Sequence, residues 1–406
     1  MRLAIVTSGF LPVPASKGGA VETLCENFIK QNEIYKEVDL TIFSSYDEEA
    51  IKDAQEYNNT RFVFIKSNVI VDLLDKCIFF VAKNILKKKN SHSFRFIFRR
   101  IHFNNIVSKY IKKDTFDKIL LENHTILYLA LKFRKNYKKY KGRYYYHCHN
   151  SVPGKFMCSK IIENTNNIIC VSKYRMNAFK KDLNIVKPQF SVVLNSIDPS
   201  IINRNIKDDE KEEMYIKYKL KSTDKILIYT GRFVPGKGIE EILSAVEKAK
   251  SQNIKLFVIG ASLNALDVTN NFEQEILRKS EKIKDKVIFT GYINYQELYK
   301  YYAIADVAIL PSIIEDSAPL TIIEAINCGL PIITTNSGGI PEYVNNKCAI
   351  ILKRDENLIK NMTNAIDTLL LNEELRKTMK KESSRVANQL DLKKYYYNIL
   401  KEMECI

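Results

Sequence analysis

The densest group of residues that could carry chemistry is the segment TGRFVPGKG, residues 230–238, which follows an apolar, strand-like run. Gly231 ends that run, and Arg232 and Lys237 lie in a loop before a segment with helical spacing that begins near Ile239. Two cations beside a helix N-terminus can neutralise a diphosphate leaving group as its bond to a sugar breaks, without a metal ion. The alternative interpretation is that both side chains are ordinary solvated loop charges.

A second segment places acidic side chains just before the start of a helix. Glu315 and Asp316 follow a strand-like run, and Glu324 comes eight residues after Asp316 among isoleucine and alanine neighbours. A carboxylate in an apolar setting usually has a defined partner, for example a ribose diol, although a helix-start charge favoured by the helix dipole is the alternative. Free backbone N–H groups at this helix start could bind phosphate or sugar oxygens. The segment concerned is Ser317, Ala318, Pro319, Leu320 and Thr321.

The first half of the chain offers a glycine pair and a histidine. Gly18 and Gly19 follow the first strand-like run and open a helical segment, so backbone amides could approach a phosphate or sugar there, although a simple turn is equally compatible. His149 follows another strand-like run, and His147 lies on the same side of that strand but deeper, which favours a structural role. We expect no zinc site from His147, Cys148 and His149, because adjacent strand residues point to opposite faces.

Strand-like apolar runs alternate with helical segments such as Ala20–Gln31, which predicts α/β architecture with parallel sheets. The alternation restarts after residue 222, so the chain is expected to contain two doubly wound domains. The runs are Leu3–Thr7, Val38–Phe43, Phe62–Ile65, Lys118–Leu121, Arg143–His147, Ile168–Val171 and Ser191–Leu194, and then Lys225–Tyr229, Lys255–Ile259, Lys286–Thr290, Val307–Leu310, Pro331–Thr334 and Ala349–Leu352.

The length of 406 residues fits two domains of about 200 residues. We predict a first domain at 1–198, a second domain at 199–385, and a C-terminal helix within 386–406 that packs back on the first domain. Ligands of open parallel sheets bind outside the carboxyl ends of the strands, which is where the motifs above fall. A cleft between two such domains is therefore the expected site.

Several of these motifs together resemble the retaining glycosyltransferases of family four, which have the GT-B fold. The resemblance rests on GRFVPGKG, on FTGYI at 289–293, and on ADVAILPSIIEDSAPLTIIEAINCGLPIITTNSGGIPE at 305–342. It is dense over about 190–345, and CVSK at 170–173 and NSID at 195–198 extend it. Each motif alone is weak, whereas their order and spacing together are highly specific.

The resemblance implies roles for residues of the second half. Arg232 and Lys237 match the basic pair that holds the donor diphosphate. Glu324 matches the second acid of the family's E-x7-E motif, which grips the nucleotide ribose. The first acid of that motif falls at Asp316 in place of glutamate, with Glu315 next to it. Either of these two acids could therefore face the donor sugar.

The resemblance also implies contacts at the edges of this site. Tyr292 and Ile293 occupy the loop that usually contacts the base through backbone groups. His149 is similar to the family's cleft histidine near the donor sugar. The family's Asn-Gly loop reads Asn195-Ser196 here, so the local backbone could differ. No cofactor or metal ion is implied, since the nucleotide sugar is a substrate.

The net charge of +16 lies almost entirely in the first half: residues 1–200 carry 33 Lys and Arg against 18 Asp and Glu, and the remainder carries 30 against 29. Between Lys76 and Lys113 eleven residues are basic, none is acidic, and apolar side chains interleave; Lys132–Arg143 is similar. This mixture predicts a peripheral contact with an anionic membrane, with a solvated basic face as the alternative. We expect no nucleic-acid partner, because no motif of that kind is present.

The chain is thus expected to be an enzyme, a retaining glycosyltransferase of hexosyltransferase type that uses a UDP-sugar and a glycan or lipid-linked acceptor. Its expected context is bacterial capsule, lipopolysaccharide or glycolipid synthesis. The chain has scattered cysteines and no apolar run of 18 residues, so we expect it in the cytoplasm, peripheral to the inner membrane face. The alternatives are a nucleotide-sugar epimerase of similar build, and a non-catalytic membrane-binding or nucleic-acid-binding protein on this scaffold.

Overall fold

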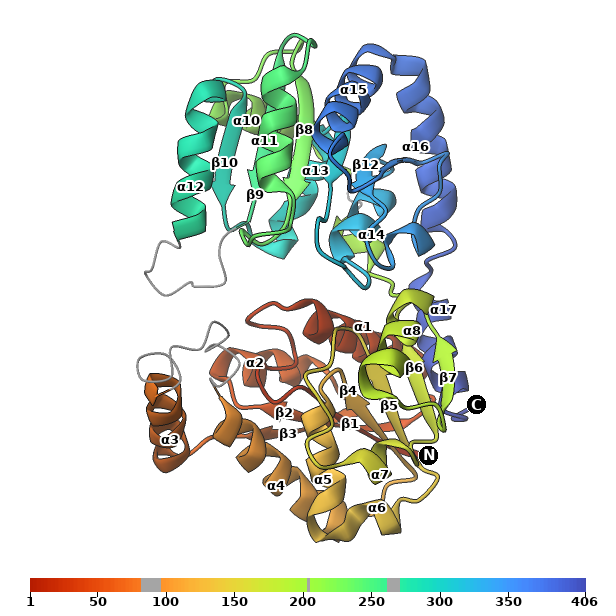
Figure 1. Ribbon diagram of the computed structural model, residues 1–406. Helices are drawn as coiled ribbons and strands as arrows, with labels where there is room; N and C mark the ends of the chain where they lie inside the picture. Colours follow the sequence, from red (N-terminus) through yellow and green to blue (C-terminus); the bar gives the residue numbers. More distant parts are fainter. Residues whose placement is uncertain (82–95, 203–204, 261–270) are drawn as a thin grey trace. The chain divides into compact units, whose positions relative to one another are not determined.

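The computed structural model describes residues 1–81, 96–202, 205–260 and 271–406 (Figure 1). Part of the basic stretch noted above, residues 82–95, lies outside the described residues. The chain divides into two compact units. Unit 1 comprises Met1–Leu194 and Leu392–Ile406, and unit 2 comprises Asn195–Asp391.

Unit 1 is built on a seven-stranded parallel sheet with the strand order β3-β2-β1-β4-β5-β6-β7. The order reverses direction between β1 and β4, which is the point at which doubly wound sheets bind ligands. The strands are β1 Arg2–Val6, β2 Asp39–Ser45, β3 Thr60–Ile65, β4 Lys118–Glu122, β5 Tyr144–Cys148, β6 Asn167–Cys170 and β7 Gln189–Val192.

Helices cover both faces of the unit 1 sheet. The helices are α1 Ala20–Tyr35, α2 Glu48–Asp53, α3 Val69–Phe80, α4 Ile97–Lys113, α5 Tyr128–Lys132, α6 Asn136–Lys139, α7 Ser159–Ile162, α8 Lys173–Leu183 and α17 Leu392–Glu402. The core on one face joins the apolar side chains of α4, α5 and α8 to alternate strand residues. On the other face α17 packs on α1, where Tyr396 donates a hydrogen bond to Asn32 (2.7 Å) and its ring lies 4.9 Å from that of Phe28.

Unit 2 repeats the architecture with a six-stranded parallel sheet of order β10-β9-β8-β11-β12-β13. Its strands are β8 Lys225–Thr230, β9 Ile254–Ile259, β10 Val287–Gly291, β11 Val307–Leu310, β12 Ile332–Thr335 and β13 Ala349–Leu352. Its helices are α9 Pro199–Ile202, α10 Asp208–Lys217, α11 Ile239–Lys248, α12 Asn271–Ser280, α13 Leu298–Ile304, α14 Leu320–Asn327, α15 Leu358–Leu371 and α16 Glu373–Ala387.

The expected α/β class with two doubly wound parallel sheets is confirmed, and each apolar run overlaps an observed strand. The limits of the units differ from the predicted 1–198, 199–385 and 386–406. Asn195 belongs to unit 2, because its backbone N–H donates to Tyr343 Oη (2.9 Å) of that unit. Leu390 stays with unit 2 as well, since Ser196 donates to its carbonyl (2.5 Å).

Candidate active site

In unit 2 the loop after β8 folds onto the loop after β11. Gly236 and Gly238 have φ values of 85° and 82°, in the left-handed region that favours glycine. A Cβ atom at Gly238 would collide with the carbonyl oxygen of Pro311, and one at Gly236 would collide with Ile314. The backbone N–H of Ile313 also donates to the Gly236 carbonyl (2.8 Å). The glycines of GRFVPGKG therefore allow the basic loop to approach the acidic loop.

This approach brings Lys237 against Asp316, and the two form an ion pair. Arg232 is exposed, and no carboxylate among the described residues lies within 4.0 Å of its guanidinium. Glu315 lies apart from this pair: it accepts hydrogen bonds from Arg354 Nη2 (2.6 Å) and from the backbone N–H of Gly338 (2.6 Å). The two neighbouring acids, which the sequence left as equivalent candidates, thus have different partners, and Asp316 is the acid beside the basic loop.

The segment after β12 holds Asp316 in place, which the sequence analysis missed. Asp316 N–H donates to Ser337 Oγ (3.1 Å), and Gly339 N–H donates to the Asp316 carbonyl (2.8 Å). Gly338 has φ 50°, and a Cβ atom there would collide with the Asp316 backbone. The pair of glycines in NSGG, residues 336–339, was the signal that could have revealed this contact.

Glu324 lies on α14 with only 5% of its surface exposed. Tyr302 Oη donates to its carboxylate (2.9 Å) and is itself 2.7 Å from Thr230 Oγ1, so β8, α13 and α14 are joined by side chains. Burial raises the pKa of Glu324 from 4.5 to about 7, against the lowering effect of the Tyr302 hydrogen bond. A buried carboxylate with one protein donor has oxygen lone pairs left for a ligand hydroxyl.

Two helices of unit 2 begin beside these residues. No side-chain hydrogen bond caps the N-terminus of α11, which follows Gly238, or that of α14, which follows Pro319. Their first N–H groups are therefore available to a ligand anion. The expected donor segment Ser317–Thr321 leads into α14, and Ser317 within it is buried.

The other unit 2 candidates lie at the ends of the sheet and of the unit. Tyr292 directly follows β10 and is 75% exposed, and Ile293 beside it is partly buried. Gly231 directly follows β8, and its N–H donates to the Ile259 carbonyl (3.0 Å). Asn195 is buried, and no described residue donates a hydrogen bond to its side-chain oxygen.

In unit 1 the ends of β4 and β5 bring together Glu122, His147 and His149. Glu122 and His147 are paired in register, and His149 follows two residues later on the same face. Glu122 Oε1 lies 3.2 Å from His147 Nδ1, Glu122 Oε2 lies 3.0 Å from His149 Nε2, and the two ring nitrogens are 3.1 Å apart. All three side chains are buried. Sequence reasoning missed Glu122, whose signal was a charged residue at the end of the buried run KILLE.

The surroundings of Glu122 and His149 shift the pKa values of both side chains. Burial alone would raise the pKa of Glu122, but the two histidines beside it hold that pKa at about 2. Burial and the neighbouring His147 lower the pKa of His149 to about 4. His149 Nδ1 has no partner among the described residues, so a His149 that donates from Nε2 to Glu122 presents Nδ1 as an acceptor for a hydroxyl group.

The same three residues are also the candidate set for a metal ion, since one ligand atom of each lies within 4.8 Å of the others. The sequence analysis had considered His147, Cys148 and His149 instead. Cys148 belongs to the core on the opposite face of the sheet, and Glu122 takes its place in the set.

The glycine loop of unit 1 lies at the start of α1. Gly18 and Gly19 have φ values of 67° and 109°, and a Cβ atom at Gly19 would collide with the Glu22 carboxylate. Ser8 Oγ donates to Glu22 (3.1 Å), and burial raises the pKa of Glu22. No side-chain hydrogen bond caps α1. Gly19 therefore makes room for a buried acid, and the uncapped helix start leaves N–H groups available.

Replacing Glu122 with glutamine should destabilise unit 1 by about 1–3 kcal/mol, because one histidine would lose its anionic acceptor and face an amide N–H instead. Thermal unfolding should show a melting temperature several degrees lower, while nucleotide binding by unit 2 stays unchanged. Glu49→Gln, at a carboxylate that is 64% exposed, is the matched control. Equal melting temperatures for the two variants would contradict the importance of this cluster.

Comparison with known proteins identifies the domain in unit 2. Residues 210–386 match the family described as Glycosyl transferases group 1. A lipopolysaccharide 1,2-N-acetylglucosaminetransferase of Salmonella typhimurium is 25% identical over 229 residues, 56% of each chain. A putative glycosyltransferase of Bacillus subtilis, YtcC, is 24% identical over 396 residues, which cover 95% of this chain and 87% of that protein.

Solved structures agree on the fold. HepE of Anabaena, solved in complex with UDP, superposes with a TM-score of 0.72 at 15% identity and covers 100% of both chains. The present chain spans about half the length of some curated relatives, as with the Salmonella enzyme. These matches agree with the expected class of enzyme. Residues 210–386, which lie within unit 2, therefore resemble a glycosyl transferases group 1 domain.

Proposed function

We propose that this chain is a retaining glycosyltransferase that moves a sugar from a nucleotide diphosphate, with UDP as the nucleotide, to a glycan or lipid-linked acceptor. The observation that carries the proposal is the arrangement in unit 2, where Lys237 and Asp316 pair beside the uncapped starts of α11 and α14. The exposed Arg232 lies in the loop after β8, and the buried Glu324 lies on α14. Such a site has cations for a diphosphate and a carboxylate for a ribose diol.

In the proposed reaction the bond between the anomeric carbon and the departing phosphate oxygen breaks. The acceptor hydroxyl attacks from the same face, and its proton passes to that phosphate oxygen, so the configuration is retained. The protein positions the groups and stabilises the charge of the leaving diphosphate, in which Arg232, Lys237 and the helix starts would act together. Transfer without a metal ion is part of this proposal.

Two comparisons support the finer parts of the proposal. UDP and UDP-glucose are the ligands named for HepE, whose fold this chain shares. The Salmonella relative is named as a transferase of N-acetylglucosamine to lipopolysaccharide. We therefore propose that the donor is a UDP-sugar. We also propose that the chain acts in the synthesis of cell-surface polysaccharide, capsule or lipopolysaccharide.

The test is nucleotide release from a panel of nucleotide sugars, with and without bacterial lipid extract, for the wild type and Glu324→Ala. Release from one donor that is stimulated by lipid and lost in the variant would support the proposal and identify the donor. Interconversion of the nucleotide sugar without release would indicate an epimerase. Binding without turnover under every condition would indicate a non-catalytic protein on this scaffold.

We also propose that unit 1 meets the anionic inner face of a membrane, as a peripheral protein of the cytoplasm. None of the helices in the described ranges has the length and apolar character needed to cross a bilayer. α3, which packs on α4, instead exposes apolar side chains: Val69 is 84% exposed, Ile70 70% and Leu73 59%. Apolar side chains on a helix of a strongly basic domain are typical of a helix that lies in the membrane interface.

Flotation with phosphatidylglycerol vesicles at low salt should recover the wild type with the vesicles, and the double variant Ile70→Asp, Leu73→Asp should lose most of this binding. The control is Leu371→Asp, because Leu371 is also an exposed leucine (74%) but belongs to unit 2. An equal loss in the control, or no flotation of the wild type, would exclude the membrane contact.

A further inference from the structure

A pocket of about 430 Å³ opens in unit 1 at the carboxyl ends of β1, β2 and β3. It lies between the loops after these strands and the N-terminal part of α4. Among the side chains that line it are Phe10, Tyr46, Lys66, Val69, Arg99 and His102. The carboxyl ends of parallel strands are where doubly wound domains bind their ligands. None of these residues belongs to the candidate active site described above.

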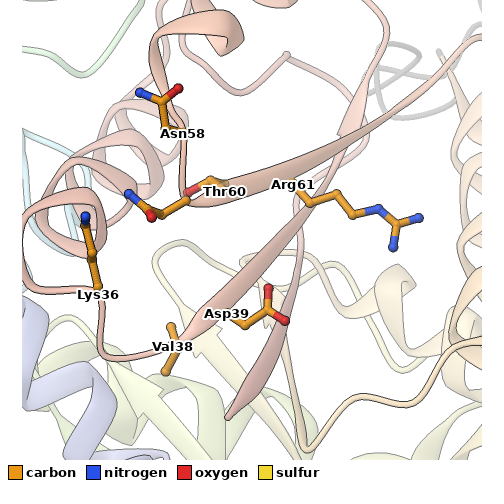
Figure 2. A pocket seen from close by; sticks show the side chains of 7 residues that line it. Lys36, Val38, Asp39, Asn58, Thr60 and Arg61 are labelled. Carbon is orange, nitrogen blue, oxygen red and sulfur yellow. The ribbon is translucent and has the colours of Figure 1, made fainter.

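A second hollow, of about 480 Å³, lies at the opposite, amino ends of β2 and β3 (Figure 2). The side chains of Lys36 and Arg61 point away from each other there. Asn59 and Thr60 are already hydrogen-bonded to Glu33 (2.9 and 2.7 Å). The polar side chains of this hollow therefore do not converge on one point, and we assign no ligand to it.

The two acids of the carboxyl-end pocket are committed to the fold. Asp47 caps α2 by accepting from the backbone of Ala50 (3.1 Å), and it also accepts from Ser16 Oγ (2.8 Å). Asp72 accepts from Arg99 Nη2 (2.7 Å) and from Ser67 Oγ (3.1 Å). Neither carboxylate is therefore the main contact for a ligand.

The basic side chains of the pocket differ in whether a carboxylate pairs with them. Lys66 is exposed, its Nζ lies 4.6 Å from the centroid of the Tyr46 ring, and no carboxylate of the described chain pairs with it. Lys17, which also lines the pocket, has its carboxylate partners at 3.5 and 3.6 Å and is half exposed. Arg99 and Lys17 already pair with carboxylates, so Lys66 is the cation that remains, among the described residues that line the pocket, for a ligand with an anionic group.

The polar pocket continues into an apolar surface. Val69 lines the pocket and begins α3, and Ile70 and Leu73 extend the exposed apolar side chains along that helix. Phe10 on the pocket wall is also 40% exposed. A ligand that suits this surface is amphiphilic, with an anionic head beside Lys66 and an apolar chain along α3.

We infer that this pocket binds the phosphate-bearing head of a lipid-linked acceptor and that α3 contacts its lipid chain. This inference rests on the proposed glycosyltransferase function and names the acceptor class for it. Both a lipid-linked acceptor and a soluble phosphate compound would present a phosphate group to this pocket. Only the lipid-linked acceptor also has an apolar chain that could contact α3.

The inference is tested by calorimetry on the full chain with octyl phosphate below its micelle concentration. Lys66→Ala should weaken binding about tenfold, the scale of one charge-assisted hydrogen bond. The control Lys112→Ala removes the same charge from the far end of α4, roughly 20 Å from Arg99 by helical rise, and should leave binding unchanged. Leu73→Ser should weaken the binding of octyl phosphate but leave the binding of inorganic phosphate unchanged.

Four outcomes would overturn the inference. They are no binding of octyl phosphate, equal binding by Lys66→Ala and wild type, equal binding of octyl glucoside, and equal binding of inorganic phosphate. The last outcome would indicate a free phosphate compound as the ligand. UDP binding, measured separately, reports on unit 2, so its loss would count against the proposed function and not against this pocket.

Discussion

Alanine in place of Lys237 is expected to lower the turnover number roughly 10²-fold or more, the scale of losing one preorganised donor to a developing anion. The left-handed glycines on both sides fix the loop that carries Lys237, and Asp316 pairs with its ammonium group. The charge is therefore positioned before the nucleotide binds. A preorganised cation of this kind stabilises the leaving diphosphate more than it stabilises the bound substrate, so kcat should fall more than the affinity for UDP.

Steady-state kinetics with saturating donor, together with calorimetry of UDP, separates these two quantities. Lys248→Ala is the matched control, because Lys248 is exposed at the other end of α11, roughly 15 Å away by helical rise. Arg232→Ala should show a loss on the same scale, since its guanidinium is the second cation of the loop. Near-normal turnover in both Arg232→Ala and Lys237→Ala would remove the diphosphate assignment.

Glutamine in place of Glu324 is expected to weaken UDP binding by about 10² and to change the pH dependence of stability. The binding loss follows from replacing a buried carboxylate, which can accept from a ribose diol, with an amide that offers one acceptor oxygen. UDP affinity of the wild type should also increase between pH 6 and pH 8, because the carboxylate ionises near pH 7. The variant should show no such increase from this group.

The stability effect has a definite sign. Burial raises the pKa of Glu324 from 4.5 to about 7, so the folded state binds this proton more tightly than the unfolded chain does. The stability from that proton is complete below pH 4.5 and is lost as pH rises through about 7. The loss is at most on the order of 3 kcal/mol. Glu324→Gln cannot ionise, so the melting temperature of the variant relative to wild type should rise from pH 5 to pH 8.

Differential scanning calorimetry of both proteins without nucleotide, at pH 5 and pH 8, measures this difference. Asp367→Asn is a useful comparison. Partial burial would raise the pKa of Asp367, but hydrogen bonds from Ser251 and Lys250 outweigh that effect and lower it. That variant should show no gain at pH 8. A difference between Glu324→Gln and wild type that does not change with pH would contradict a carboxyl group that titrates near neutrality.

The sequence by itself determined the two sheets and the position of the basic loop. Buried parallel strands have continuous apolar runs such as Val307–Leu310, which local composition alone identifies. Arg232 and Lys237, in a loop before the helical segment that begins near Ile239, indicated two charges at a helix start. Motifs over 289–342 then indicated the enzyme class, with which the match of residues 210–386 to the group 1 family agrees.

The tertiary structure alone decided which distant residues are partners. The pairing of Asp316 with Lys237, and of Glu315 with Arg354, depends on how the loops after β8, β11 and β13 fold together. Glu122 meets His147 because β4 and β5 are neighbours in register, although 25 residues separate them in the chain. Such contacts depend on strand order and register, which are set by packing of the whole sheet, so the local sequence marks candidate residues without identifying their partners.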